Sequence, residues 1–198
     1  MMQNEIFELL RFEEDAVFDD LYPVHIQNLS QLHWTPLNIA KQAAAFLAES
    51  NAKILDIGSG VGKFCIIAGY YNPQARFYGI EQRRELTLVA ELAKKELNLS
   101  NIDFIHGNLT DLNFEAYDHF YFFNSFYENL KPENGIDQKI KTTKELYNYY
   151  TRFLFQQLDQ KPSGTKLVTY HGARKQIPQS YQLVENSCHY ALKFWIKD

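Results

Sequence analysis

The sequence predicts an α/β fold: an open, mostly parallel, Rossmann-like seven-stranded sheet with helices on both faces and a C-terminal antiparallel hairpin. Short apolar runs alternate with amphipathic helical patterns as far as residue 170, which is the order expected of a parallel sheet. A glycine-rich turn separates the first strand from the first crossover helix. The last two strands are only a few residues apart, so they must pair antiparallel instead of through a crossover.

Composition places the chain among globular proteins with a sizeable core. It has 198 residues, 45% of them hydrophobic and 22% charged, which fits one domain. The net charge of −4 does not indicate a strongly basic nucleic-acid binder, although Lys and Arg gather in the C-terminal part. A solvated face is the favoured reading of that gathering, and a small basic patch is the alternative.

The two cysteines and the N-terminus point to the cytoplasm. Cys65 and Cys188 lack metal-ligand spacing, so both are expected to be reduced thiols in or near the core. The first ten residues are acidic and do not resemble a signal peptide. No apolar run approaches the roughly 18 residues of a membrane span.

Residues 1–34 are expected to form a helical or lid segment, and residues 35–198 the main domain. An acidic amphipathic helix is predicted over residues 3–20, followed by an irregular connection over 21–34. Thr35 and Pro36 predict a helix start, with the Thr35 hydroxyl as N-cap and the helix ending near Ser50.

The remaining elements follow from the alternation of apolar and amphipathic stretches. Crossover helices are predicted over 63–71, 83–98 and 142–160, and strands over 52–57, 76–80, 101–105, 119–123, 166–170, 182–186 and 191–196. The fully apolar run 119–123 is typical of a strand covered on both faces. Ligands in such sheets bind at the carboxyl ends of the parallel strands.

The glycine-rich turn carries the first evidence for a ligand. Gly58, Gly60 and Gly62 alternate after Asp56, where the chain needs positive φ angles and close access to the backbone. A dinucleotide fingerprint needs glycine at the sixth position, which is Lys63 here, and a long lysine opposes close helix–strand packing. The spacing instead favours S-adenosylmethionine, whose ammonium group an acid near the turn can meet.

Four motifs in order resemble those of class I S-adenosylmethionine-dependent methyltransferases. They are ILDIGSGVG at 54–62, YGIE at 78–81, HGNLTDL at 106–112 and NSFYE at 124–128. The resemblance implies that Glu81 accepts hydrogen bonds from the ribose hydroxyls and that the 106–112 loop contacts the adenine. The cofactor-binding residues that it implies are Asp56, Gly58, Ser59, Gly60, Gly62, Glu81, Gln82, Asn108, Leu109 and Asn124.

Narrower likenesses concern the methyl acceptor. DIGSGVG, YGIE and the Asn-x-Phe after the fourth strand resemble the non-SET histone lysine methyltransferases. NSFY is also similar to the Asn-Pro-Pro-Tyr motif of enzymes that methylate amide or exocyclic amino nitrogens, with Ser125 and Phe126 in place of the prolines.

The expected reaction is therefore methyl transfer to a nitrogen acceptor, which is a protein lysine in the leading hypothesis. Methylation of RNA or of a small molecule, and a non-catalytic cofactor-binding module, are the alternatives. Asn124 is the predicted catalytic residue that orients the acceptor nitrogen, and Tyr127 is predicted to wall the pocket or stack on the acceptor. No metal site is expected, because the histidines lack ligand spacing. The sequence leaves open the oligomeric state and whether residues 1–34 act as a lid.

Overall fold

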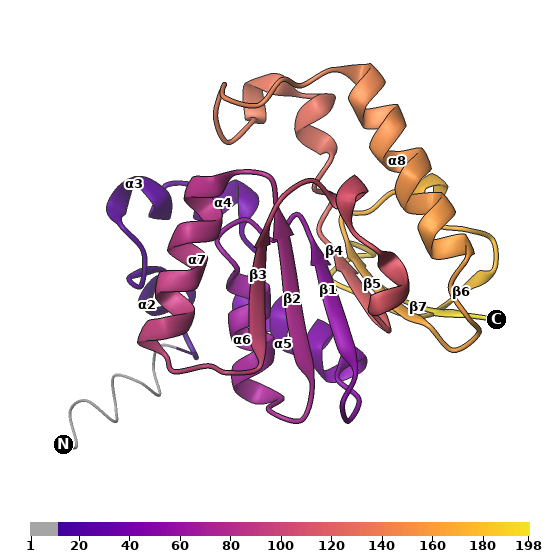
Figure 1. The fold of residues 1–198 in the computed structure, drawn as a ribbon, viewed down its shortest axis with the longest axis horizontal. Coiled ribbons are helices and arrows are strands. Elements are labelled where there is room, and N and C mark those ends of the chain that lie inside the picture. The colour runs from indigo at the N-terminus through magenta and orange to yellow at the C-terminus, as the bar shows by residue number, and fades with distance from the viewer. Residues whose placement is uncertain (1–11) are drawn as a thin grey trace.

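The computed structural model describes residues 12–198 as one seven-stranded sheet with helices on both faces (Figure 1). The strand order is β3-β2-β1-β4-β5-β7-β6. The first five strands are parallel, and β7 pairs antiparallel with both β5 and β6. The predicted fold class is confirmed. The strands are β1 (Lys53–Ile57), β2 (Arg76–Glu81), β3 (Ile102–His106), β4 (His119–Phe122), β5 (Lys166–Tyr170), β6 (Tyr181–Ser187) and β7 (Leu192–Lys197).

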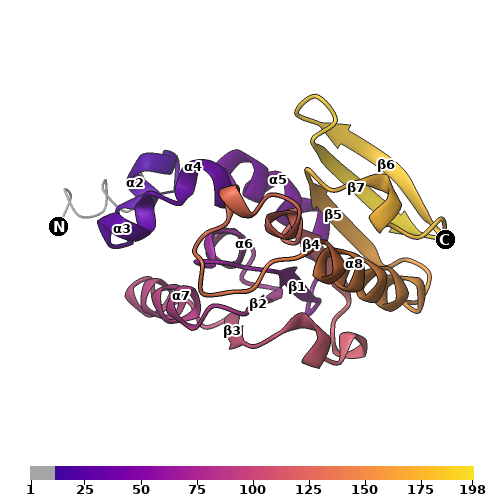
Figure 2. The same cartoon turned by 90° about the horizontal axis from the view of Figure 1, so that it is seen from above.

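Helices cover the two faces of the sheet unequally. Helices α5 (Leu37–Leu47), α6 (Lys63–Tyr71) and α7 (Arg84–Glu96) pack on one face. Helix α8 (Lys144–Asp159) and two 3-10 turns cover the other. Figure 2 shows α8 on one side of the sheet and α5, α6 and α7 on the opposite side. All four residues of β4 are buried, as its apolar run predicted.

The segment before α5 is less regular than the sequence predicted. Within the described residues, helix α2 covers only Asp15–Asp19, and the part of the predicted 3–20 helix before residue 12 lies outside them. Two further short helices, α3 (Val24–Gln27) and α4 (Ser30–His33), occupy the predicted irregular connection. Helices this short are stabilised by packing and not by propensity, here by the buried side chains of Phe18 on α2 and Ile26 on α3.

The predicted N-cap at Thr35 is wrong. The Thr35 hydroxyl hydrogen-bonds the Tyr121 hydroxyl at 2.9 Å, and α5 begins at Leu37. The Leu37 N–H instead donates to the Asp15 carboxylate at 3.0 Å, so a residue distant in sequence caps the helix. Helix α5 also ends at Leu47, short of Ser50.

Lys63 binds the N-terminal segment to the body of the domain. Its ammonium group lies 2.6 Å from Asp15 Oδ1 and 2.6 Å from Asp19 Oδ1, and only 4% of its side chain is exposed. A second link is the Tyr22 hydroxyl, which donates to the Val61 carbonyl at 2.9 Å. The lysine does not obstruct helix–strand packing, because its side chain extends away from the sheet to these carboxylates.

The two free cysteines have different environments. Cys65 is buried on α6, as predicted, whereas Cys188 is exposed in the turn between β6 and β7, so the prediction of a near-core position for Cys188 is wrong. The nearest apolar residues before Cys188, Leu183 and Val184, belong to β6 and are themselves exposed. Over residues 12–198, no helix combines the length and apolar character needed to cross a membrane.

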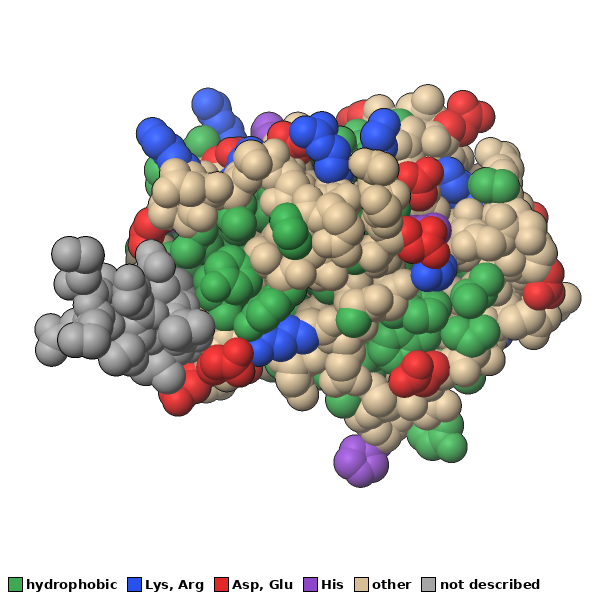
Figure 3. Space-filling model, turned by 90° about the horizontal axis from the view of Figure 1, so that it is seen from below, with side chains coloured by type: hydrophobic (Ala, Val, Ile, Leu, Met, Phe, Trp, Pro, Cys, Tyr) green, Lys and Arg blue, Asp and Glu red, His purple; other side chains and the backbone are tan. Residues whose placement is uncertain are grey.

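The underside of the molecule shows no large area of one charge. Acidic and basic side chains are interspersed there with apolar ones (Figure 3). An extended basic face is thus absent from that view, and any concentration of positive charge must be sought elsewhere.

Candidate functional site

The glycine turn has the backbone that its sequence predicts. Gly58, Gly60 and Gly62 have φ angles of 75°, 55° and 80°, in the left-handed region that favours glycine. A Cβ added at Gly58 would lie 2.5 Å from the Ser125 Cβ, and one at Gly62 would overlap the Phe104 ring. Positions 58 and 62 therefore require glycine for space as well as for backbone conformation.

One cavity lies beside this turn, at the carboxyl ends of β1, β2 and β4. Nine of the sequence-predicted site residues line it: Asp56, Gly58, Ser59, Glu81, Gln82, Asn108, Leu109, Asn124 and Tyr127. Gly60 and Gly62, also predicted to bind the cofactor, are not part of the cavity wall. They shape the turn from behind, since Gly62 is the left-handed residue that precedes α6.

Glu81 is fixed by the backbone around it. Its carboxylate accepts the Gly60 N–H at 3.1 Å and the Arg83 N–H at 2.7 Å, and the residue is buried. Desolvation raises the pKa of this carboxyl, and the two N–H donors oppose the rise. A carboxylate has about four acceptor sites, so Glu81 keeps acceptor capacity toward the cavity.

Asp56 is a buried acid without a cation partner among the described residues. Burial raises its pKa to about 8. Its one hydrogen-bond contact is the Cys65 thiol, which donates at 3.7 Å. A positive group placed against this carboxyl would favour its ionised form.

The loop after β3 adopts an Asx-type cap at Asn108. Its side-chain oxygen accepts the Thr110 N–H at 3.1 Å and the Thr110 hydroxyl at 3.0 Å. Its amide donates to the Tyr150 hydroxyl at 2.8 Å. Asn108 therefore holds the 3-10 turn Leu109–Asp111 against α8, while Leu109 presents an apolar surface to the cavity.

The loop after β4 is docked on the glycine turn. The Ser125 hydroxyl donates to the Ile57 carbonyl at the end of β1. Asn124 has a φ of 38°, a conformation uncommon outside glycine, and its carbonyl accepts the Tyr127 N–H at 2.9 Å. Within the described residues, the Asn124 side-chain amide has no hydrogen-bond partner, so it is available to a ligand in the cavity.

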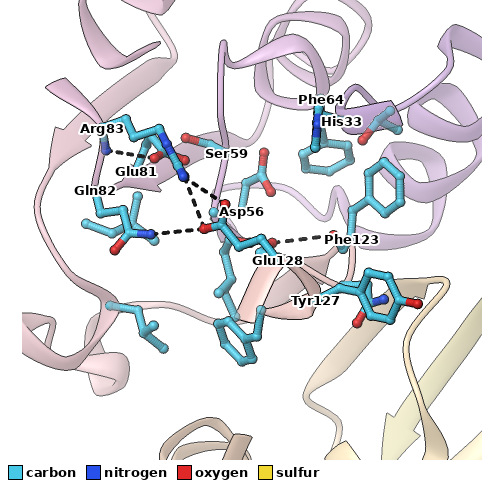
Figure 4. A pocket seen from close by; sticks show the side chains of 18 of the residues that line it. His33, Asp56, Ser59, Phe64, Glu81, Gln82, Arg83, Phe123, Tyr127 and Glu128 are labelled. Atoms are coloured by element: carbon cyan, nitrogen blue, oxygen red, sulfur yellow. Dashed lines mark hydrogen bonds and ion pairs between the residues drawn. The ribbon is translucent and has the colours of Figure 1, made fainter. Parts of the chain in front are cut away.

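An ion pair that sequence reasoning missed joins the two sides of the cavity. Arg83 and Glu128 form a two-point contact of 2.7 and 3.2 Å, with both side chains at least nine-tenths buried (Figure 4). Gln82 donates to the same carboxylate at 3.4 Å, and Asp137 lies 3.3 Å from Arg83 Nε. The only sequence signals were the positions of the two residues, Glu128 at the end of the NSFYE motif and Arg83 two residues after YGIE. Because 45 residues separate the partners, these signals did not predict the pair.

The N-terminal segment supplies a further wall. Leu32, His33, Trp34 and Thr35 line the cavity, and Trp34 also packs against Tyr22, with ring centres 4.9 Å apart. Trp34 thus serves as packing anchor and as cavity wall. Burial lowers the pKa of His33. In the close-up, Phe123 and Tyr127 lie on the opposite side from Arg83, with Asp56 between them (Figure 4).

Tyr170 and His171 stand behind this wall. They are not cavity residues, but their rings contact Phe123, which is, at 4.6 and 5.9 Å. Among residues 12–198, no group of three or more His, Cys, Asp or Glu side chains is arranged to hold a metal ion.

Comparison with known proteins identifies a matching family and several similar proteins. The family model described as "Methyltransferase domain" matches residues 48–193. A tRNA (guanine-N(7)-)-methyltransferase of Prochlorococcus marinus (strain NATL1A) is 32% identical over 85 residues, which are 43% of this chain and 40% of that protein. The enzyme of the same name from Trichormus variabilis is 29% identical over 84 residues, covering 42% and 39%. The matched stretch thus spans about 40% of the length of these relatives.

Solved structures share the fold at low identity. An RNA methyltransferase from Salinibacter ruber, in complex with S-adenosyl-L-homocysteine, has a TM-score of 0.56 and 18% identity, covering 83% of this chain and 92% of that one. A SAM-dependent methyltransferase from Aquifex aeolicus has a TM-score of 0.56 and 13% identity, covering 87% and 98%. At these identities the likeness concerns the fold alone.

Proposed function

This chain belongs to the methyltransferase domain family, in agreement with its sequence motifs, and we propose that it is an S-adenosylmethionine-dependent enzyme that methylates a nitrogen of RNA. The observation that carries the proposal is the division of the cavity. Two buried carboxylates, Asp56 and Glu81, lie on the glycine-turn side. The Asn124 side-chain amide, which has no hydrogen-bond partner within residues 12–198, lies on the side of the β4 loop.

The cofactor half fits the chemistry of S-adenosylmethionine. Asp56 is a buried acid whose raised pKa reflects a missing counter-charge, and the ammonium group of the methionine part would supply it. Glu81 would accept the ribose hydroxyls with its remaining lone pairs, and Leu109 would lie against the adenine. The absence of a Cβ at Gly58 lets the ligand approach the backbone. When bound, the cofactor supplies a methyl group on a sulfonium, which is already activated for transfer.

The acceptor half favours a neutral planar nitrogen over a lysine. A lysine ammonium, with an ordinary pKa of about 10.4, must lose a proton before it can attack. Glu81 and Glu128 are already hydrogen-bonded within the protein, and Asp56 belongs to the cofactor half. A purine ring nitrogen carries a free lone pair and needs no base. Asn124 would hydrogen-bond the base edge and Tyr127 would stack on its face.

The relatives support the same acceptor class. Those reported above are named for guanine-N7 methylation of tRNA, and none supports the likeness to histone lysine methyltransferases. RNA, an alternative in the sequence reading, therefore replaces protein lysine as the proposed substrate. The net charge of −4 was a poor guide here, because it averages an acidic N-terminal part with a basic C-terminal part.

Two organisational features belong to the proposal. Residues 12–34 form a cover over the cofactor cavity, supported by the cavity-lining positions of Leu32, His33 and Trp34, and residues 35–198 form the catalytic domain. The enzyme works in the cytoplasm, in keeping with its free thiols.

Radiolabelled methyl transfer tests the proposal. The protein is incubated with tritium-methyl S-adenosylmethionine and, separately, with tRNA transcribed in vitro, a protein fraction and a metabolite fraction. We expect label in tRNA and N7-methylguanosine in its nuclease digest. Glu81→Gln, with weakened cofactor binding, should incorporate far less. Label confined to the protein or metabolite fraction would overturn the RNA assignment.

A further inference from the structure

We propose that the turn between β6 and β7, together with the end of β5, binds the single-stranded nucleotides that flank the methylated base. This surface, the hairpin rim, consists of Tyr170, His171, Cys188, His189, Tyr190 and Lys193. The inference rests on the proposed RNA methylation and adds to it a docking site outside the cavity.

The rim lies at the edge of the sheet where the cavity opens. Tyr170, the last residue of β5, is in register with Leu192, the first residue of β7, so the turn before β7 lies at the carboxyl edge. The His171 N–H donates to the Ala191 carbonyl at 2.8 Å and joins the two segments. A run of rings connects them to the cavity, since Tyr170 contacts His171 at 4.3 Å and Phe123 at 4.6 Å.

The turn presents its side chains in an unfavourable backbone conformation. Cys188, His189 and Tyr190 are three consecutive non-glycine residues with φ angles of 51°, 53° and 66°. Glycine would adopt this conformation without steric cost. Tyr190 is nevertheless 69% exposed, and the turn projects from the sheet in the view from above (Figure 2). A strained turn that displays an aromatic side chain to solvent points to a use for that side chain.

Charge in this part of the chain has the sign that RNA requires. The six rim residues include one lysine, Lys193, and no acidic residue. Within the described residues, Lys193 has no carboxylate partner, and its ammonium group contacts the Gly172 carbonyl at 3.4 Å. Its charge lies close enough to His171 to lower that residue's pKa, after the larger effect of burial.

Aromatic side chains next to a lysine that has no carboxylate partner among the described residues match single-stranded nucleic acid. Bases stack on exposed tyrosine and histidine rings, and lysine neutralises phosphates. An acidic peptide would also bind Lys193. It would have no use for the exposed ring of Tyr190 beside the Tyr170, His171 and Phe123 rings that lead to the cavity. The rim is therefore assigned to RNA, and peptide binding becomes an outcome of the test.

The native protein carries its own reporter for this surface. Cys188 is exposed in the rim and Cys65 is buried, and the chain has no other cysteine. Alkylation of the folded protein by iodoacetamide should therefore modify Cys188, with Cys65 as the unreactive reference. We expect unmodified tRNA transcript to slow this modification several-fold, and S-adenosylhomocysteine or a poly-glutamate peptide alone to leave it unchanged. Modification at an unchanged rate with saturating tRNA, or protection by the peptide instead, would overturn the assignment.

A double variant tests the contribution of the rim to catalysis. Tyr190→Ala with Lys193→Gln should raise the KM for tRNA about tenfold, the usual size of a lost base-stacking contact. The kcat and the affinity for S-adenosylhomocysteine should stay unchanged. The matched control is Leu92→Ala with Lys95→Gln on α7, which likewise removes an exposed apolar side chain and an exposed lysine.

The outcomes separate the two proposals. If tRNA is methylated and both variants behave like the parent protein, the rim assignment fails and the proposed function stands. If tRNA protects Cys188 but receives no methyl group, the rim stands as an RNA-binding surface and the proposed function fails. If no RNA protects Cys188 or accepts methyl groups, both fail.

Discussion

Replacing Lys63 by methionine should destabilise the protein more than any other single loss of a lysine. Methionine keeps most of the apolar volume and removes the charge that faces Asp15 and Asp19, each 2.6 Å from the ammonium group. The Asp19 side chain is only 12% exposed, so its carboxylate would stay buried without a counter-ion. Breaking one side of a buried pair costs about 3–5 kcal/mol.

The lower end of that range applies here. The Asp15 side chain is 50% exposed and water can replace its lost partner, so Asp19 accounts for most of the penalty. We expect a loss of about 3 kcal/mol in the free energy of unfolding, a large part of the roughly 5–15 kcal/mol typical of a domain. Equilibrium urea unfolding, followed by tyrosine and tryptophan fluorescence, measures it.

Two comparisons decide whether the charge is responsible. Lys41→Met removes the more exposed pair with Glu13, at 3.1 Å, and should cost less than about 1 kcal/mol. Adding Asp19→Asn to Lys63→Met should restore part of the stability, because the unpaired charge is gone. A cost below about 1 kcal/mol for Lys63→Met, or no recovery in the double variant, would refute this reasoning.

Four further predictions concern the cavity and its glycine turn. The pKa of Asp56 is about 8 in the folded protein, above its ordinary value, so the protein without cofactor should lose stability as pH rises from about 4 to 8. Asp56→Asn should therefore be more stable than the parent protein at pH 8. Equal pH profiles of the two proteins in thermal unfolding would contradict this. The same carboxyl ionises against the cofactor's ammonium group, so affinity for S-adenosylhomocysteine should rise up to about tenfold per pH unit below pH 8, and calorimetry should record proton release. Both Gly58→Ala and Gly60→Ala must hold alanine at a positive φ, which costs about 1–2 kcal/mol. Gly58→Ala should destabilise the protein more than Gly60→Ala, because of these two positions only Gly58 would place the new Cβ against a neighbour, Ser125. Equal melting temperatures would refute the steric argument. Asn124→Ala should lower kcat about tenfold by loss of one hydrogen bond to the acceptor; full turnover would exclude its predicted catalytic role.

Local signals were sufficient where one stretch of chain determines its own conformation. The helix over Lys63–Tyr71 has the predicted bounds, because a glycine turn begins it and Asn72 and Pro73 end it. The three glycines have the predicted positive φ angles, since no other residue type takes up that turn at low cost. The meeting of residues from four motifs in one cavity also followed from the sequence, because parallel strands bring their carboxyl ends to one edge.

Signals failed where a partner distant in sequence decided the outcome. Thr35 is a residue type that favours the N-cap position, but its hydroxyl is hydrogen-bonded to the Tyr121 hydroxyl, and Asp15 caps α5 instead. Asn108 lines the cavity as predicted, but its bond to the Tyr150 hydroxyl, 42 residues away, could not be read from its local sequence. Propensity describes what a segment prefers alone, and contacts formed on folding override it.

The sequence by itself determined the fold class, the glycine turn and the resemblance to a methyltransferase, because each depends on residue type and spacing within a short stretch. Only the tertiary structure decided that β7 lies between β5 and β6, that Lys63 holds the N-terminal cover, and that Arg83 and Glu128 join the two sides of the cavity. The Lys63 and Arg83 ion pairs join residues 44 or more positions apart. The place of β7 is a choice between hairpin arrangements that share the same local sequence pattern. Their energies arise from burial and charge contacts that exist only once the chain has folded.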